Sequence, residues 1–128
     1  GTVGRSGIIF TKKRWRPSPV EQPDVLINEA AKIYKVLSNS TRIKILYYLR
    51  HQTDEVDVKT IVNDLGLAQP VVSKQLGILR RYQLVCSRRS GTRVFYILDD
   101  PHIMELTDDM IAHVKHEIKG EPHPKNLY

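Results

Sequence analysis

Apolar residues recur every three or four positions in the first half of the chain, a spacing typical of amphipathic helices. Asp24 is expected to cap the first helix, which ends at the polar break 38–40. Its apolar face holds Val25, Leu26, Ala30, Ile33, Tyr34 and Leu37. The second helix covers 41–50 and ends at His51. In it, Ile43, Leu46, Tyr47 and Leu49 are expected to point inward, and Arg42, Lys44 and Arg50 outward.

Two further predicted helices are joined by a tight turn. Asp57 is expected to cap the first of them and Gly66 to end it. Its apolar face consists of Val58, Ile61, Val62 and Leu65. The stretch 67–83 follows at once, with Val72, Leu76 and Leu79 as its inward face. Pro70 is compatible with the first turn, where its missing N–H would have no helical partner. Two helices with a Gly-containing turn between them indicate a helix-turn-helix.

The pattern then changes from helical to alternating. From Leu84 to Leu98, β-forming residues flank the turn sequence Ser-Gly-Thr at 90–92, which predicts a β-hairpin with arginines near its tip. A helix-turn-helix followed by a basic hairpin predicts a winged helix. We therefore expect a mainly helical (α+β) fold in the order helix, helix, helix, recognition helix, strand, strand, helix.

The charges along the chain are unevenly distributed. The net charge is +6, and the segment from Ala68 to Leu98 contains no acidic residue, which favours a polyanionic partner. Short polar side chains beside cations suit duplex DNA, so double-stranded operator DNA is the expected partner. The candidate contacts on the recognition helix are Gln69, Val71, Ser73, Lys74 and Gln75. Those on the wing are Arg88, Arg89, Ser90, Thr92 and Arg93. A solvated basic surface is the alternative interpretation.

The remaining segments divide the chain. Residues 1–23 lack a helical period and are expected to form a poorly ordered basic arm. Lys12, Lys13, Arg14 and Arg16 could contact phosphates there, and Trp15 could pack on the body of the protein. The domain proper is expected at 24–118, and 119–128 as a flexible tail.

Other broad classes are disfavoured by composition. The single cysteine, Cys86, excludes an internal disulfide and a multi-thiolate metal site within one chain. No apolar run approaches the ~20 residues that a membrane-spanning helix needs. We expect a cytoplasmic protein with no membrane and no small-molecule substrate as partner.

The segment 99–118 combines an apolar seam with three of the chain's five histidines. Asp100 is expected to cap a helix that begins at Pro101. At about 100° per residue, one arc holds Ile103, Leu106, Met110, Val114 and Glu117. The neighbouring edge holds His102, Asp109, His113 and His116. An apolar seam on a terminal helix predicts a two-fold homodimer.

Helical geometry limits which of these histidines can bind one ion. His113 and His116 are separated by a rise of roughly 4.5 Å and can share a metal, whereas His102 lies about 16 Å from His113. If two helices pack antiparallel across a dyad, His102 of one copy comes level with both histidines of the other. Asp100 can supply a fourth ligand, with Asp109 as its rival. Three imidazoles and one carboxylate suit tetrahedral Zn²⁺ or Co²⁺.

The chain resembles the ArsR/SmtB family of bacterial metal-responsive repressors over about residues 25–118. The motifs that carry this resemblance are LSNSTRIKILYYL, LGLAQPVVSKQLGILRRYQLV, SRRSGTRVFYIL and DDPHIMELTDDMIAHVKH. The last is similar to the inter-subunit, C-terminal-helix site of CzrA-like zinc and cobalt sensors. That resemblance implies Asp100 and His102 from one protomer with His113 and His116 from the other, and it selects Asp100 over Asp109.

The resemblance implies a dimeric repressor rather than an enzyme. Such a protein binds its operator when metal-free and releases it when Zn²⁺ or Co²⁺ binds, derepressing metal efflux genes. Two departures from the family pattern stand out. Asp57 and Lys59 replace the Cys-x-Cys of the arsenic, cadmium and lead sensors, and Ala68 and Pro70 stand where serines are common.

Three alternatives remain. A zinc hydrolase is disfavoured because a catalytic site keeps an open position for water, whereas this ligand set fills four positions. A winged-helix regulator could instead use the histidines to respond to pH or another non-metal signal. His123 could add a ligand and favour Ni²⁺ or Co²⁺, although a surface histidine is the simpler interpretation.

Overall fold

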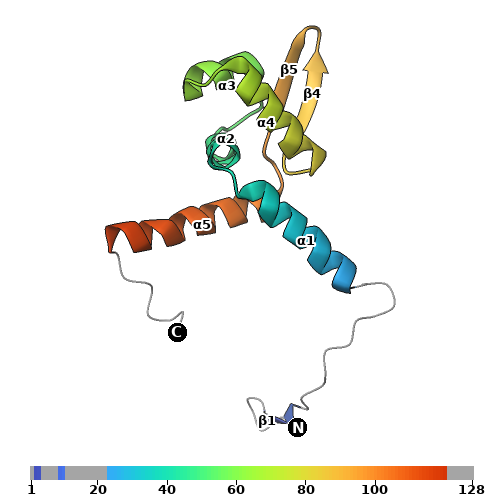
Figure 1. Cartoon of the computed structure of the whole chain (residues 1–128), viewed down its shortest axis with the longest axis vertical. Coiled ribbons are helices and arrows are strands. Elements are labelled where there is room, and N and C mark those ends of the chain that lie inside the picture. Colours follow the sequence, from blue (N-terminus) through green and yellow to red (C-terminus); the bar gives the residue numbers. More distant parts are fainter. Residues whose placement is uncertain (1, 4–8, 11–22, 121–128) are drawn as a thin grey trace. The chain divides into compact units, whose positions relative to one another are not determined.

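The computed structural model describes residues 2–3, 9–10 and 23–120 (Figure 1). They fall into two compact units, one up to Lys32 and one from Ile33 onward. In the first, strand β1 (Thr2–Val3) pairs antiparallel with β2 (Ile9–Phe10). The arm residues Lys12, Lys13, Arg14, Trp15 and Arg16, as well as His123, lie outside the described residues.

The first two predicted helices are present, with small differences at their ends. Helix α1 (Pro23–Leu37) begins at its proline, so Asp24 lies in the first turn and is not the N-cap. Proline suits this position because its fixed φ is already helical. Helix α2 (Ser40–Arg50) is capped by Asn39, whose side chain accepts a hydrogen bond from the Arg42 N–H at 3.0 Å. The break at 38–40 therefore both ends one helix and starts the next.

The inward-facing residues of α2 differ in part from the predicted set. Ile45 is fully buried together with Leu46 and Leu49, whereas Tyr47 is 36% exposed. Arg42 and Arg50, which were expected outward, are half-buried. Each forms hydrogen bonds with another element, and these partners offset the cost of partial burial. The sequence pattern could not predict those partners.

The helix-turn-helix prediction is confirmed. Helix α3 (Val58–Leu65) is capped by Asp57, whose Oδ1 accepts from the Thr60 N–H at 3.1 Å. It ends at Gly66, where φ is +63°, a value that favours glycine. Helix α4 (Gln69–Arg81) carries a proline in its first turn. The predicted inward residues of α4 are fully buried: Val72, Leu76 and Leu79.

The predicted hairpin consists of β4 (Cys86–Ser90) and β5 (Arg93–Ile97), joined by a two-residue turn at Gly91 and Thr92. A third strand, β3 (Val56–Asp57), pairs antiparallel with β5, so the sheet order is β3-β5-β4. The sequence did not predict β3, because two residues are too few to show alternation. This strand fixes the wing to the start of α3.

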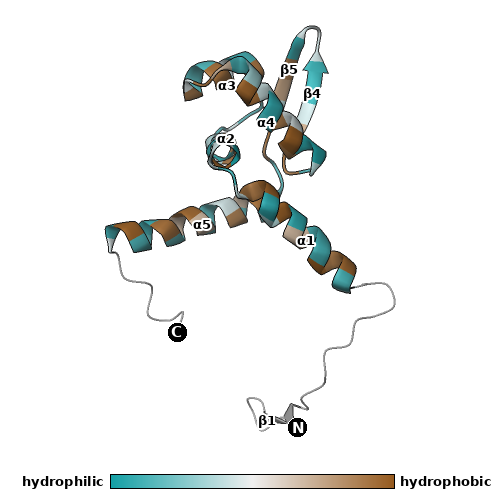
Figure 2. Cartoon of the chain, viewed as in Figure 1, coloured by the Kyte–Doolittle hydropathy of each residue, from teal (hydrophilic) through white to brown (hydrophobic). Residues whose placement is uncertain are grey.

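Helix α5 (Pro101–Lys119) matches the predicted C-terminal helix, with Asp100 as its N-cap. None of its residues is buried. Ile103 and Met104 pack against the edge of the core, whereas Met110, Val114 and Ile118 are 51%, 39% and 78% exposed. The predicted seam is therefore only partly covered, and Met104, which the prediction omitted, belongs to the covered side. Figure 2 shows hydrophobic residues at intervals along the whole helix.

The predicted face of α1 is also largely exposed. Val25 and Leu26 are 55% and 58% exposed, and Tyr34 is 63% exposed. Only Val36 is buried, while Ile33 and Leu37 pack against the core from its edge. The core consists of Val36, Ile45, Leu46, Leu49, Ile61, Val72, Leu76, Leu79, Leu84, Val85, Tyr96 and Leu98. Most of the buried surface therefore lies in α2 to β5.

Candidate functional site

The exposed face of α4 carries the polar residues proposed to read DNA. Gln69, Ser73 and Lys74 are exposed, and Val71 is 41% exposed. Gln75 differs from these, because it is half-buried and its Oε1 accepts a hydrogen bond from Arg42 Nε at 2.8 Å. The same arginine donates to the Val36 carbonyl at 2.7 Å. Gln75 thus connects the recognition helix to α2, and Arg42 connects α2 to the end of α1.

A hollow of about 720 Å³ separates the start of α4 from the tip of the wing. It is lined by Asp57, Val58, Lys59, Gln69, Ser73, Thr92, Arg93 and Val94. The first turns of α4 and the wing therefore border one hollow that contains polar side chains and the cations Lys59 and Arg93. Grooved surfaces with cations and short polar side chains suit a nucleic-acid backbone.

A second hollow, of about 740 Å³, extends this surface toward the C-terminal end of α4. Lys74, Arg80 and Arg81 line it around Gly77, which has no side chain to fill the space. Arg80 and Arg81 were not among the predicted DNA contacts. The acid-free segment that contains them was the signal that could have found them.

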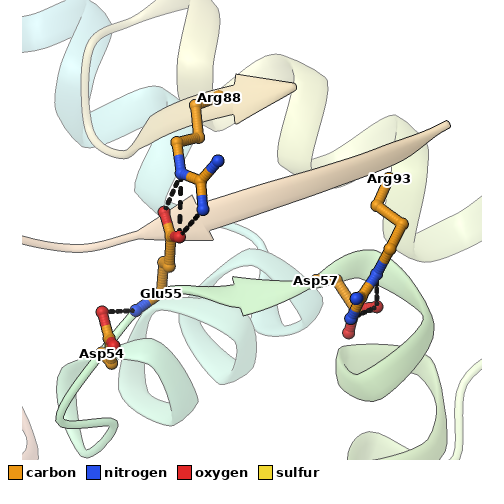
Figure 3. A network of polar contacts seen from close by, with 5 residues as sticks. All are labelled: Asp54, Glu55, Asp57, Arg88 and Arg93. Carbon is orange, nitrogen blue, oxygen red and sulfur yellow. Dashed lines mark hydrogen bonds and ion pairs between the residues drawn. The ribbon is translucent and has the colours of Figure 1, made fainter. Parts of the chain in front are cut away.

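The wing carries two arginines that form ion pairs with carboxylates of the chain itself (Figure 3). Arg88 forms a bidentate ion pair with Glu55. Arg93 donates to Asp57 Oδ2 from Nη2 at 2.9 Å and from Nε at 3.2 Å. The hydrogen bonds from Thr60 and Arg93 lower the pKa of Asp57 to about 2, so this carboxylate is ionised at neutral pH. Arg89, Ser90 and Thr92 are exposed at the tip.

The proposed metal ligands lie in two groups on α5. Asp100 Oδ1 accepts from the His102 backbone N–H at 2.8 Å and lies 3.2 Å from His102 Nδ1. The His102 side chain is 93% exposed. His113 is exposed and His116 is half-buried; along the helix axis they lie about 16 and about 21 Å from His102. Within residues 23–120, no three His, Cys, Asp or Glu side chains of one chain gather as a metal site.

Two features connect α5 to α2. Arg50 forms a bidentate ion pair with Asp108, with N–O distances between 2.8 and 3.1 Å. Beside it lies an apolar cavity of about 290 Å³. The cavity is lined by Tyr34, Leu37, Ile43, Leu46, Leu106, Thr107, Met110 and Ile111. The sequence did not predict the Arg50–Asp108 pair, whereas Asp109, the rival ligand, is exposed.

The single cysteine lies beside an acidic side chain at the start of β4. Cys86 is exposed, and its Sγ lies 3.6 Å from Asp99 Oδ1. Partial burial and the nearby Asp99 carboxylate raise the pKa of the Cys86 thiol, which disfavours the nucleophilic thiolate.

Comparison with known proteins gives the family. A family model described as bacterial regulatory protein, arsR family, matches residues 39–87, which run from the cap of α2 into β4. The HTH-type transcriptional regulator KmtR of Mycobacterium tuberculosis is 31% identical over 106 residues, covering 83% of this chain and 78% of that protein. The chain belongs to the ArsR family.

Two further proteins extend the comparison. A cadmium resistance transcriptional regulatory protein, a CadC homologue from Staphylococcus aureus, is 32% identical and covers 66% of this chain and 69% of that protein. The crystal structure of Rv0081 from M. tuberculosis superposes with a TM-score of 0.64 at 30% identity, covering 75% of this chain and 96% of that one. The winged helix-turn-helix is thus the shared architecture.

As an ArsR-family member, the chain is a DNA-binding transcriptional regulator, and α4 with the hairpin β4–β5 supplies its winged helix-turn-helix. The helices in the described ranges include none with the length and apolarity of a membrane span. The resemblance noted from the sequence is confirmed at the level of the family.

Proposed function

We propose that this ArsR-family chain is a homodimeric, metal-sensing repressor. The metal-free dimer binds operator DNA, and Zn²⁺ or Co²⁺ bound at two inter-subunit sites lowers that affinity and derepresses metal efflux genes. The observation that carries the proposal is the exposure of α5 and the spacing of its candidate ligands. This helix has no buried residue in the single chain, and it holds two metal-binding groups too far apart to meet within it.

A second copy of the chain is the occupant that best suits the exposed stripe on α5. Met110, Val114 and Ile118 follow each other at intervals of four and are all exposed. Fully burying a side chain of this kind contributes about 1.5–3 kcal/mol, so a symmetric contact, which counts each residue twice, is strongly favourable.

The donors on α5 fit a zinc or cobalt ion. Asp100 is extended, with ψ of 116°, and its carboxylate lies against the His102 ring, so both groups point to one place. His113 and His116, three residues apart, form the other half of the set. Antiparallel packing of two α5 helices brings each half beside the complementary half of the partner. A bound ion would then cross-link the two helices, which is the chemistry that the metal supplies.

The ion pair between Arg50 and Asp108 offers a path from α5 to the DNA-reading helix. Arg50 belongs to α2, and Arg42 of the same helix binds Gln75 of α4. A shift of α5 on metal binding would therefore be passed to α4 through α2.

Zinc can act in this way only if it binds the dimer conformation with low DNA affinity more tightly than the conformation with high DNA affinity. Two recognition helices must lie about 34–36 Å apart to fit successive major grooves.

The proposed DNA contacts from α4 are Gln69, Val71, Ser73 and Lys74. Glutamine can pair with adenine in the major groove, valine can meet a thymine methyl, and serine and lysine can bind bases or phosphates. Gln75 contributes through its contact with Arg42. On the wing, the candidate contacts are Arg88, Arg89, Ser90, Thr92 and Arg93, and of these Thr92 and Arg93 line the hollow beside α4.

Operator affinity with and without metal tests the function. The probe is the duplex that the wild-type chain enriches from a randomised pool, and the readout is fluorescence anisotropy with stoichiometric Zn²⁺ or Co²⁺. We expect the metal to weaken binding at least tenfold, about 1.4 kcal/mol, in the wild type. His113→Ala and His116→Ala should abolish this effect.

His51→Ala is the matched control, because His51 caps α2 and its Nδ1 lies 2.8 Å from the Tyr47 carbonyl oxygen. This variant should respond to metal like the wild type. Full metal-dependent release in His113→Ala would contradict the proposal, and so would an affinity that stoichiometric metal leaves unchanged. A response to pH in place of metal would favour a non-metal signal read through the same histidines.

A further inference from the structure

The sheet register places the two paired wing arginines on one face of the wing. Asp57 of β3 lies opposite Phe95 of β5, and Arg88 of β4 lies opposite the same Phe95. Directly opposed residues share a face, and so do residues two apart on one strand. Arg93, two residues before Phe95, therefore lies on this face as well. Figure 3 shows the two arginines reaching toward carboxylates at and beside β3.

Phe95 gives both guanidinium groups a common support. The Arg88 and Arg93 Cζ atoms lie 4.7 and 4.8 Å from the centre of its ring. At this distance a guanidinium is attracted to the negative face of the aromatic ring. Each arginine is thus held on one side by a carboxylate and on the other by Phe95, which fixes its orientation more tightly than a lone surface ion pair would.

The carboxylates belong to the start of the helix-turn-helix. The Asp57 side chain is only 10% exposed, and besides binding Arg93 it caps α3. Glu55 lies two residues earlier, and its side chain is 25% exposed. Because both carboxylates come from the segment that leads into α3, the two pairs join the wing to the helix-turn-helix at two points.

Arg89 has a different environment. It lies opposite Val94, on the other face of the hairpin, and is exposed. In the described part of the chain the Arg89 side chain forms no hydrogen bond or ion pair. Its cation is therefore available to a phosphate without first giving up a carboxylate of the protein.

Building on the proposed DNA-binding function, we infer that Arg88 and Arg93 position the wing against α3, and that Arg89 is the wing arginine that binds DNA phosphate. Arg88 and Arg93 keep 56% and 62% of their side-chain surface exposed. The competing possibility is that they exchange their carboxylates for phosphates when DNA binds. The two cases differ in how binding depends on salt.

The experiment measures the salt dependence of binding for the full-length variants Arg89→Gln, Arg88→Gln and Arg93→Gln. The probe is the duplex enriched by the wild type from a randomised pool. Each phosphate contact contributes about 0.9 to the slope of log affinity against log salt, so loss of two Arg89 contacts in a dimer should lower the slope by about 1.8. Arg88→Gln and Arg93→Gln should weaken binding by a similar factor at every salt concentration, with the slope unchanged.

Either of two results would overturn the assignment. One is an unchanged slope in Arg89→Gln, and the other is a slope lowered by about 1.8 in Arg88→Gln or Arg93→Gln. A wild-type chain that enriches no duplex would refute the proposed DNA function together with the role of Arg89. The positioning role is therefore measured separately, on the free protein.

Amide hydrogen exchange in β4 and β5 provides that separate measurement. Glu55→Gln and Arg88→Gln should each speed exchange about threefold to fivefold. The double variant Glu55→Gln/Arg88→Gln should exchange little faster than either single variant, because both changes break the same ion pair. Arg89→Gln is the matched control and should leave exchange unchanged. Unchanged exchange in Glu55→Gln would overturn the positioning role whatever the DNA measurements show.

Discussion

The segment from α2 to β5 and the helix α5 differ sharply in how they are packed. Ile45, Ile61, Val72, Leu76 and Leu79 are all 0% exposed, whereas α5, the longest helix described, has no buried residue. The first region buries its apolar side chains within one chain. The second does not, because its stripe Met110, Val114 and Ile118 remains exposed. The comparison teaches that the winged helix-turn-helix packs its own core, whereas the helix to which we assign metal sensing leaves apolar surface that a second copy could cover.

The largest expected effect concerns the self-contained unit. Leu76→Ala removes a fully buried side chain of α4 and should lower the free energy of unfolding by about 2–5 kcal/mol, because a cavity remains. Urea denaturation at a concentration where the chain is monomeric measures it. Met110→Ala, in the half-exposed stripe of α5, is the comparison variant and should cost less than about 1 kcal/mol there. Equal losses would remove the contrast between the two regions.

The next effect concerns association. Val114→Asp places a charge in the exposed stripe and should weaken dimerisation at least a hundredfold, about 3 kcal/mol, because the carboxylate would be buried without a partner. Sedimentation velocity gives the dissociation constant, and circular dichroism should show an unchanged fold. Ala112→Asp introduces the same charge on a different side of α5 and should leave the dimer intact. Dissociation by both variants, or by neither, would contradict the use of this stripe.

A smaller effect tests strain within the well-packed region. Gln83, just after α4, has φ of +61°, in the left-handed region that costs a side-chain-bearing residue about 1–2 kcal/mol. Gln83→Gly should therefore raise stability by about 0.5–1 kcal/mol after the added flexibility of the unfolded glycine is counted. Thermal melting measures the gain. Gly91→Gln, at φ of +62° in the wing turn, is the reverse change and should lower the melting temperature.

The same two regions explain what could be predicted from the sequence. Local signals defined α3, α4 and the hairpin, because Asp57, Gly66 and Pro70 mark helix ends whatever the tertiary context. Strand β3 and the inward position of Ile45 depend on long-range packing, so they were missed. The proposed ligand residues of α5 come from the sequence pattern alone, because three histidines on an amphipathic helix need an explanation.

Contacts between side chains that are far apart in the sequence could not be predicted from it. The pairs Arg50–Asp108 and Arg88–Glu55 join residues 58 and 33 positions apart. Periodicity carries no information on such pairs, and the sequence alone led to Arg50 as a solvent-facing residue. The role of Arg88 changed for the same reason, from an assigned DNA contact to a residue that we propose positions the wing.

The central claim is that each metal site combines His102 of one protomer with His113 and His116 of its twin. Mixing two variants tests it most directly. His102→Ala and the double variant His113→Ala/His116→Ala should each fail, as homodimers, to give the intense visible absorption of tetrahedral Co²⁺. The mixed dimer keeps one intact site, formed by Asp100 and His102 of the double variant with His113 and His116 of the other chain. The account predicts that the absorption returns on mixing, and a mixture that stays without it would contradict the account.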